Sequence, residues 1–134
     1  MKILLDTHIA LWALSDDTRL SEKARDLINN VENTIFYSSV SVWEILLKNE
    51  SPKNNLTLTP EDFIKYCEEA GYHQLSMAGK HVVEAEGLKI SNPSINHKDP
   101  FDRMLLAQAK SEKYYFLTQD SKIPSYNEKC IIEA

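Results

Sequence analysis

The chain has 134 residues, of which 43% are hydrophobic and 26% charged, so its length and composition fit one globular domain with an ordinary core. A net charge of −5 and a pI near 5.3 argue against non-specific binding to duplex nucleic acid, which depends on basic surface. The N-terminal apolar run is cut by Asp6, and no stretch approaches the roughly 18 to 20 apolar residues that span a bilayer, so we expect a cytoplasmic protein with no membrane segment.

The first part of the chain predicts two strands that each lead into a helix. Residues 2–5 have the pattern of a short buried strand, and residues 7–14 follow with apolar side chains at helical spacing. A second helix is expected from the N-cap Ser21 to about residue 31. Residues 34–38 are rich in β-branched and aromatic side chains, which predicts the second strand.

The middle of the chain predicts two further helices with one polar loop between them. Ser41 and Glu44 have the spacing of a capping box, which predicts a helix that begins at Ser41. Polar residues from position 49 to 55 end that helix and form the loop. Thr59 then stands as an N-cap before a proline and two acidic residues, which is typical of a helix start.

The second half of the chain continues the alternation of strands and helices. A strand over residues 72–77 leads into a helix from 78 to about 88, which is expected to bury Val82, Val83 and Ala85. The remaining elements are a polar loop over 89–98, a helix over 99–110, a strand over 114–118 and an edge strand over 130–132. This order predicts an α/β protein with three layers and a mostly parallel central sheet.

Five acidic residues stand where an apolar run gives way to a helix start or a turn: Asp6, Glu44, Asp99, Asp102 and Asp120. Each alone has a structural explanation, because an acid can cap a helix, favour its dipole or shape a turn. Such junctions gather along one edge of an open α/β sheet, however, and clustered carboxylates repel one another unless a cation lies among them. The pattern therefore predicts an all-oxygen site for a hard cation such as Mg²⁺ in a phosphodiesterase, with RNA as the leading substrate.

Four segments of the sequence extend this interpretation. They are Asp-Thr-His at 6–8, Ser-Val-Ser-Val-Trp-Glu-Ile at 39–45, the string from His97 to Ala109 that contains Asp-Pro-Phe-Asp-Arg, and Leu-Thr-Gln-Asp at 117–120. In order and spacing they closely resemble the PIN-domain ribonucleases, in particular the VapC-type toxins of bacterial toxin–antitoxin pairs. The resemblance covers nearly the whole chain and implies a single PIN-like domain over residues 1–134 with a three-layer α/β/α fold.

The resemblance also implies a reaction and the residues that perform it. Asp6, Glu44, Asp102 and Asp120 would hold Mg²⁺ or Mn²⁺ for hydrolysis of RNA phosphodiester bonds, leaving 5′-phosphate and 3′-hydroxyl ends. Asp99 matches the motif too, but its proline neighbour favours a cap, so it is expected to assist catalysis only through the other carboxylates. Candidates to orient a carboxylate or a water, or to contact the substrate, are Thr7, Ser39, Lys98, Arg103 and Thr118.

The partners that the resemblance implies are a second copy of the chain, in a homodimer, and a small cognate antitoxin. An acidic pocket ringed by Lys48, Lys98 and Arg103 would suit a partner that offers one Arg or Lys to the carboxylates and acidic residues to the rim. Some apolar side chains on predicted helix faces exceed what one small core needs, and part of that surface is expected at an interface: Ile9, Trp12 and Leu46.

Two other functions are compatible with the sequence. A PIN-like module could bind RNA or a protein without cleaving, although all four expected acids are present. A phosphoacceptor receiver domain is less favoured, because the chain supplies only the first half of the acid and Lys set that such a domain needs. Among the remaining residues, His8 is expected on a helix surface or an interface, His97 in a solvated loop or at a phosphate, and Trp12 and Trp43 in the core or a dimer contact.

Overall fold

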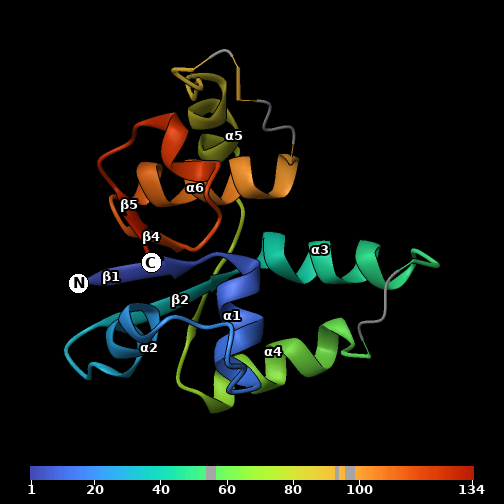
Figure 1. Ribbon diagram of the computed structural model, residues 1–134. Helices are drawn as coiled ribbons and strands as arrows, with labels where there is room; N and C mark the ends of the chain where they lie inside the picture. Colours follow the sequence, from blue (N-terminus) through green and yellow to red (C-terminus); the bar gives the residue numbers. More distant parts are fainter. Residues whose placement is uncertain (54–56, 93, 96–98) are drawn as a thin grey trace.

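A computed structural model describes residues 1–53, 57–92, 94, 95 and 99–134, in which strands and helices alternate (Figure 1). The predicted elements are all present, with boundaries that differ by a few residues. In chain order they are β1 (Lys2–Leu5), α1 (Thr7–Leu14), α2 (Glu22–Asn29), β2 (Thr34–Ser38), α3 (Ser39–Asn49), α4 (Pro60–Glu69), β3 (His73–Leu75), α5 (Gly79–Glu86), α6 (Pro100–Glu112), β4 (Tyr115–Thr118), the 3-10 helix η1 (Ile123–Tyr126) and β5 (Ile131–Glu133).

The strands of the described residues form one five-stranded sheet in the order β3-β2-β1-β4-β5. Every neighbouring pair is parallel, and Ile3 in the central strand is paired with Ile35 on one side and Tyr115 on the other. The α/β fold class is therefore confirmed, and the sheet is parallel throughout. Since all strands point the same way, the residues that follow them lie along one edge.

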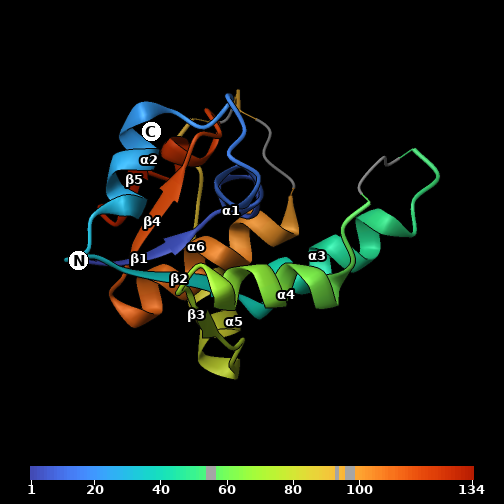
Figure 2. The same ribbon diagram turned by 90° about the horizontal axis from the view of Figure 1, so that it is seen from below.

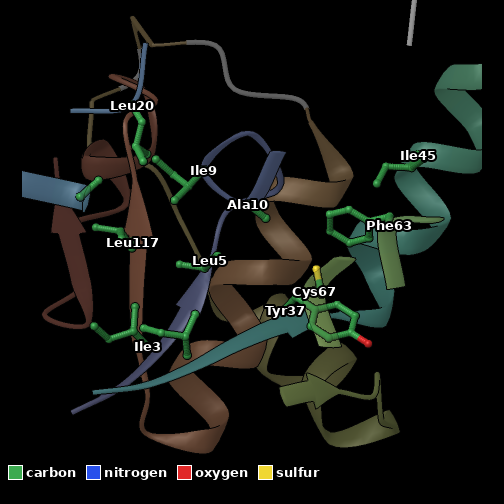
Figure 3. Packing of buried hydrophobic residues seen from close by; sticks show 12 residues of the cluster. Ile3, Leu5, Ile9, Ala10, Leu20, Tyr37, Ile45, Phe63, Cys67 and Leu117 are labelled. Atoms are coloured by element: carbon green, nitrogen blue, oxygen red, sulfur yellow. The ribbon is translucent and has the colours of Figure 1, made fainter. Parts of the chain in front are cut away.

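Helices cover both faces of this sheet. α1, α2 and α4 lie on one face, and α5 and α6 lie on the other (Figure 1). Alternate residues of β1 serve the two faces, because Ile3 and Leu5 join the cluster under α1, α2 and α4 (Figure 3), whereas Leu4 packs with α5 and α6. No helix in the described part of the chain is both long enough and apolar enough to span a bilayer.

The N-cap of α3 stands three residues earlier than the capping-box spacing predicts. This N-cap is Ser38, at the extended end of β2, and the Ser38 side chain accepts a hydrogen bond from the Val40 backbone N–H at 3.0 Å. Ser41 is instead buried inside the helix. The prediction that Glu44 completes a capping box with Ser41 is therefore wrong, because several serines precede the apolar run and the end of β2 selects the first of them. α3 then extends beyond the sheet beside α4 (Figure 1 and Figure 2).

The buried face of α5 also differs from the prediction. Val82 and Val83 are 48% and 71% exposed, whereas His81, Ala85 and Leu88 are buried. These three residues are spaced by four and three positions, so they form one stripe on the helix and the turn that follows it, and this stripe faces α6. The apolar character of the two valines was misleading, because their helical phase places them on the solvent side.

Candidate active site

Two carboxylates of the candidate site follow the neighbouring strands β1 and β4. Leu5 at the end of β1 is paired with Leu117, and the Asp6 backbone N–H continues this ladder by donating to the Leu117 carbonyl at 3.0 Å. Asp6 follows β1 directly, and Asp120 stands two residues beyond the end of β4. The parallel pairing therefore brings together two acids from opposite ends of the chain at one edge of the sheet.

One buried hydroxyl orients both of these acids. Thr118 Oγ1 donates to Asp6 Oδ2 at 2.8 Å and accepts from the Asp120 backbone N–H at 3.0 Å. The Asp120 carboxylate also accepts a hydrogen bond from the Lys122 backbone N–H at 2.9 Å, which shapes the turn after β4. Thr118 therefore contacts the Asp6 carboxylate and the Asp120 backbone, and its role in orienting carboxylates for catalysis stays a prediction.

Glu44 enters the same region from α3. It is buried, and its Oε2 forms an ion pair with Lys48 one turn further along the helix. A second buried hydroxyl pair joins α3 to the start of α1, because Thr7 Oγ1 and Ser41 Oγ lie 2.7 Å apart. Thr7 follows Asp6, and Ser41 precedes Glu44 by one turn, so this hydrogen bond connects the backbones that carry the two acids.

The remaining acids come from the start of α6. Asp99 is its N-cap, with Oδ1 accepting hydrogen bonds from the backbone N–H groups of Phe101 and Asp102 at 2.8 and 3.2 Å, so the predicted capping role is confirmed. Asp102 lies in the first turn and is buried. Burial and, secondarily, the negative charges of Asp6, Asp99, Glu44 and Asp120 raise the pKa of Asp102 to about 8.

The pKa of Asp6 is raised as well, and burial is again the main cause. The Thr118 hydrogen bond and the nearby His8 oppose this rise, whereas Glu44 and Asp120 add to it. The other four predicted acids therefore lie within electrostatic range of Asp102, and Glu44 and Asp120 also lie within range of Asp6. The five acids form an open cluster, since in the described part of the chain no three His, Cys, Asp or Glu side chains are placed closely enough to hold one metal ion.

The donor set nevertheless fits a hard divalent cation. Asp6 Oδ1 and Glu44 Oε1 are buried and have no hydrogen-bond partner among the described residues. A buried carboxylate oxygen without a partner is costly, and oxygen ligands are those that Mg²⁺ and Mn²⁺ prefer. These two atoms, with Asp102 and Asp120 nearby, are the groups that such an ion would satisfy.

Two predicted substrate contacts have other partners in the structure. Ser39 Oγ accepts a hydrogen bond from the Met77 backbone N–H at 3.0 Å, which ties the start of α3 to the segment after β3. The Arg103 guanidinium donates to the Ala85 carbonyl at 2.7 and 3.2 Å and to the Leu88 carbonyl at 3.3 Å. Ser39 and Arg103 therefore hold helix ends in place, and the substrate-binding role expected of them stays a prediction.

Lys98 and His97, which are predicted to contact the substrate or a phosphate, lie outside the described residues. The sequence predicts Ser41 only as a cap, whereas its hydroxyl contacts Thr7 within the site. No signal in the sequence distinguishes this role, because a buried Ser on a helix is recognised only by what lies opposite it.

Comparison with known proteins gives a consistent result. Two solved structures match the whole of this chain, each with a TM-score of 0.64 and 17% sequence identity. One is VapBC2 from Rickettsia felis bound to a DNA fragment from its promoter, and 98% of the matched chain is covered. The other is DNA-bound VapBC from Salmonella typhimurium, and 97% of the matched chain is covered. At this identity they show a common fold. No curated protein matches the sequence. The sequence profile of the PIN domain matches residues 3–129, which is nearly the full length, and the chain therefore belongs to the PIN-domain family.

Proposed function

We propose that this PIN-domain protein is an endoribonuclease that depends on Mg²⁺ or Mn²⁺ and acts as the toxin of a toxin–antitoxin pair. The observation that carries the proposal is the meeting of Asp6, Glu44, Asp102 and Asp120 at one edge of the sheet, with buried carboxylate oxygens on Asp6 and Glu44 that have no partner among the described residues. Membership of the PIN-domain family removes the receiver-domain alternative.

In this proposal carboxylates supply the negative charge for a metal ion, and hydroxyl groups orient the segments that carry them. A bound divalent cation would supply an activated water and offset charge on the phosphate oxygens. The four carboxylates would hold the ion, Thr118 holds the Asp6 carboxylate beside the Asp120 backbone, and the Thr7–Ser41 hydrogen bond connects the start of α1 to α3. Lys48 forms an ion pair with Glu44 Oε2, so Glu44 Oε1 would remain available to the ion.

A cleavage assay tests the proposal directly. Wild-type protein is incubated with single-stranded RNA in Mg²⁺, in Mn²⁺ and in excess EDTA, and the new ends are sequenced. We expect cleavage that stops in EDTA and returns with metal, with 5′-phosphate products. Asp26→Asn, which removes an exposed acid on α2, is the control for Asp6→Asn. Full cleavage in EDTA or by Asp6→Asn contradicts the mechanism.

A groove beside the site supports the proposed protein partner. It has a volume of about 660 Å³, lies between α1, α3 and α4, and has a largely apolar lining that also includes Lys48 and Lys53. Both similar solved structures are VapBC assemblies, which is why we propose an antitoxin as the occupant. Of the residues predicted at an interface, Ile9 is instead buried in the core, whereas Leu46 is exposed on α3 together with Leu47. The exposed Leu46 and Leu47 are the basis for proposing a homodimer.

Expression in bacteria tests these partners. The toxin assignment would be supported if the wild type arrests growth and Asp6→Asn does not. Co-expression of the neighbouring gene product should also relieve the arrest. Normal growth despite folded wild-type protein would contradict it. Light scattering at micromolar concentration tests the homodimer, and a monomer would remove that part of the proposal.

One observation favours the alternative of a PIN module that binds RNA or protein without cleaving. The described residues contain no three potential ligands already spaced to hold one metal ion. Isothermal titration with Mg²⁺ and Mn²⁺ separates the two functions, since a nuclease must bind the ion with an affinity that Glu44→Gln weakens. RNA binding without metal binding or cleavage would establish the alternative.

A further inference from the structure

A small pocket continues from the carboxylate cluster along α1. Its volume is about 240 Å³, and its lining includes Asp6 and Asp120 on the side of the cluster and His8, Ile9 and Trp12 from α1. This is smaller than the roughly 300 to 1,000 Å³ that drug-sized ligands fill, so it has room for one planar ring system. A substrate whose reacting group lies at Asp6 and Asp120 would therefore lie next to this pocket.

The aromatic wall of the pocket is held in place on several sides. The rings of His8 and Trp12 lie 5.9 Å apart, and the Arg19 guanidinium lies 5.2 Å from the Trp12 ring. Asp17 fixes that guanidinium with two hydrogen bonds of 3.1 and 2.7 Å. A ring that is already oriented loses little conformational entropy when it binds a ligand, so this wall is preorganised.

Gln119 anchors the segment that supplies Arg19. Its Oε1 accepts from the Ser21 backbone N–H at 2.8 Å, and its Nε2 donates to the Arg19 carbonyl at 3.0 Å. Gln119 stands between Thr118 and Asp120, so the turn that carries a site carboxylate also positions the loop beside Trp12. The pocket wall and the acid cluster are therefore connected through the turn that carries Gln119 and Asp120.

The chemistry of the pocket selects its occupant. Its lining next to the cluster is acidic, which disfavours a second phosphate, whereas His8 and Trp12 offer ring surfaces and the exposed residue His8 also carries ring nitrogens. Single-stranded RNA is bound by stacking its bases on aromatic rings and by hydrogen bonds to the base edges. A base is flat, uncharged and attached close to the phosphate that would lie at the carboxylates.

We propose that the pocket lined by His8, Ile9 and Trp12 binds one unpaired base of the RNA, that of a nucleotide next to the scissile phosphate. The inference rests on the proposed ribonuclease function and assigns to it a site that selects the nucleotide at the cut. Trp12, for which the sequence predicted a core or dimer contact, thereby becomes a substrate-binding residue, and His8 contributes to the choice of base.

A double-mutant cycle between protein and RNA tests this directly. The probes are an RNA that the wild type cuts and the same RNA with an abasic ribose on one or the other side of the mapped cut. We expect one abasic position to lower kcat/KM of the wild type by about 5- to 100-fold, the range for the loss of one base stack. Trp12→Leu should show a similar loss on intact RNA and no further loss on that abasic RNA.

Matched controls are present in the chain. Trp43→Leu removes an exposed Trp from α3, and His73→Asn removes an exposed His from β3, and neither residue lines the pocket. Both should keep the wild-type response to the abasic RNA, whereas His8→Asn should change the preferred base at the cut. Fully additive losses for Trp12→Leu and the abasic base would overturn the proposal, as would an unchanged base preference in both Trp12→Leu and His8→Asn.

A binding measurement separates failure of the pocket from failure of the nuclease. The chain has two Trp residues, so Trp43→Phe leaves Trp12 as the sole Trp reporter. In that background, with Glu44→Gln to prevent cleavage, single-base hexaribonucleotides should quench Trp12 fluorescence saturably in Mg²⁺. If hexamers quench Trp12 in this variant but the wild type cuts no RNA, the base pocket is retained and the nuclease function is rejected. Cleavage without quenching by any hexamer would reject the pocket alone.

Discussion

Two buried polar clusters in this protein differ in how well their atoms are paired. The first joins α3, α5 and α6: Ser38 Oγ donates to Gln108 Oε1, Gln108 Nε2 contacts His81 Nδ1 at 3.4 Å, and His81 Nε2 lies 3.1 Å from Glu112 Oε1. The second is the carboxylate cluster, where buried oxygens of Asp6 and Glu44 have no partner among the described residues.

This difference distinguishes a polar group that stabilises the fold from one that is held ready for a ligand. A fully paired buried network repays the cost of desolvation and defines how helices pack, so we assign the Ser38–Gln108–His81 network to stability. The carboxylates of the second cluster repel one another, and the fold retains them at a cost. Substitutions should therefore have opposite effects on activity and stability in the two clusters.

The largest expected effect is the loss of activity from the carboxylate cluster. Asp6→Asn and Glu44→Gln should lower RNA cleavage by more than about 100-fold, because each removes a charge that the metal ion requires. The free energy of unfolding in EDTA should stay unchanged or rise, because a buried charge is lost. Cleavage rates and urea unfolding measure both quantities, and a large loss of stability in either variant would contradict the contrast between the clusters.

Thr118 should show an intermediate effect on the same cluster. Thr118→Val removes the hydroxyl that donates to Asp6 and accepts from the Asp120 backbone, and we expect cleavage to fall by about 10- to 100-fold. Thr118→Ser keeps the hydroxyl and should retain most of the activity. Equal activity of the Val and Ser variants would show that the hydroxyl does not orient the carboxylates.

The paired network should respond in stability. Gln108→Leu removes the amide that contacts Ser38 and His81, while His81 keeps its contact with Glu112, and this loss should cost about 1–3 kcal/mol of unfolding free energy. Activity per folded molecule should stay near wild type, because no atom of this network lies in the carboxylate cluster. Urea unfolding and active-fraction measurements provide the test, and a stable but inactive Gln108→Leu protein would place the network in the catalytic machinery.

Asp102 should make the metal-free protein less stable as the pH rises. Its pKa is raised from 3.8 to about 8, so the folded state binds the proton more tightly than the unfolded state does. The contribution to stability is complete at low pH and is lost between about pH 4 and pH 8. The unfolding free energy of Asp102→Asn in EDTA should therefore exceed that of the wild type by on the order of 1 kcal/mol or more at pH 8. The difference should be smaller at pH 5. A pH-independent difference in urea unfolding would contradict this assignment.

The smallest effect concerns Asp99, which caps α6 beside the cluster. Asp99→Ala should cost roughly 1 kcal/mol of stability, whereas Asp99→Ser retains an N-cap oxygen and should cost less. Asp99→Ser should also retain much of the cleavage activity and metal affinity. If Asp99→Ser weakens metal binding in titration calorimetry as strongly as Asp102→Asn does, Asp99 would instead be a direct ligand.

Local patterns in the sequence were sufficient for the fold and for the acids. Strands and helices are set by the period of apolar residues and by caps such as Ser21 and Thr59, whose side chains accept the expected backbone hydrogen bonds. The positions of Asp6, Asp102 and Asp120 relative to those elements could be read directly, because strand ends in a parallel sheet share one edge. These inferences need only neighbours in the sequence and a general rule of topology.

The tertiary structure alone decided which polar groups are paired. Arg103 and Ser39 have suitable chemistry for substrate binding, but backbone groups of Ala85 and Met77 lie within reach and bind them. The same holds for Ser41 opposite Thr7, and for the pocket that Trp12 and His8 share with the acids. Such contacts join residues that are distant in sequence and depend on distances of a few ångströms, and no local propensity encodes a distance between elements.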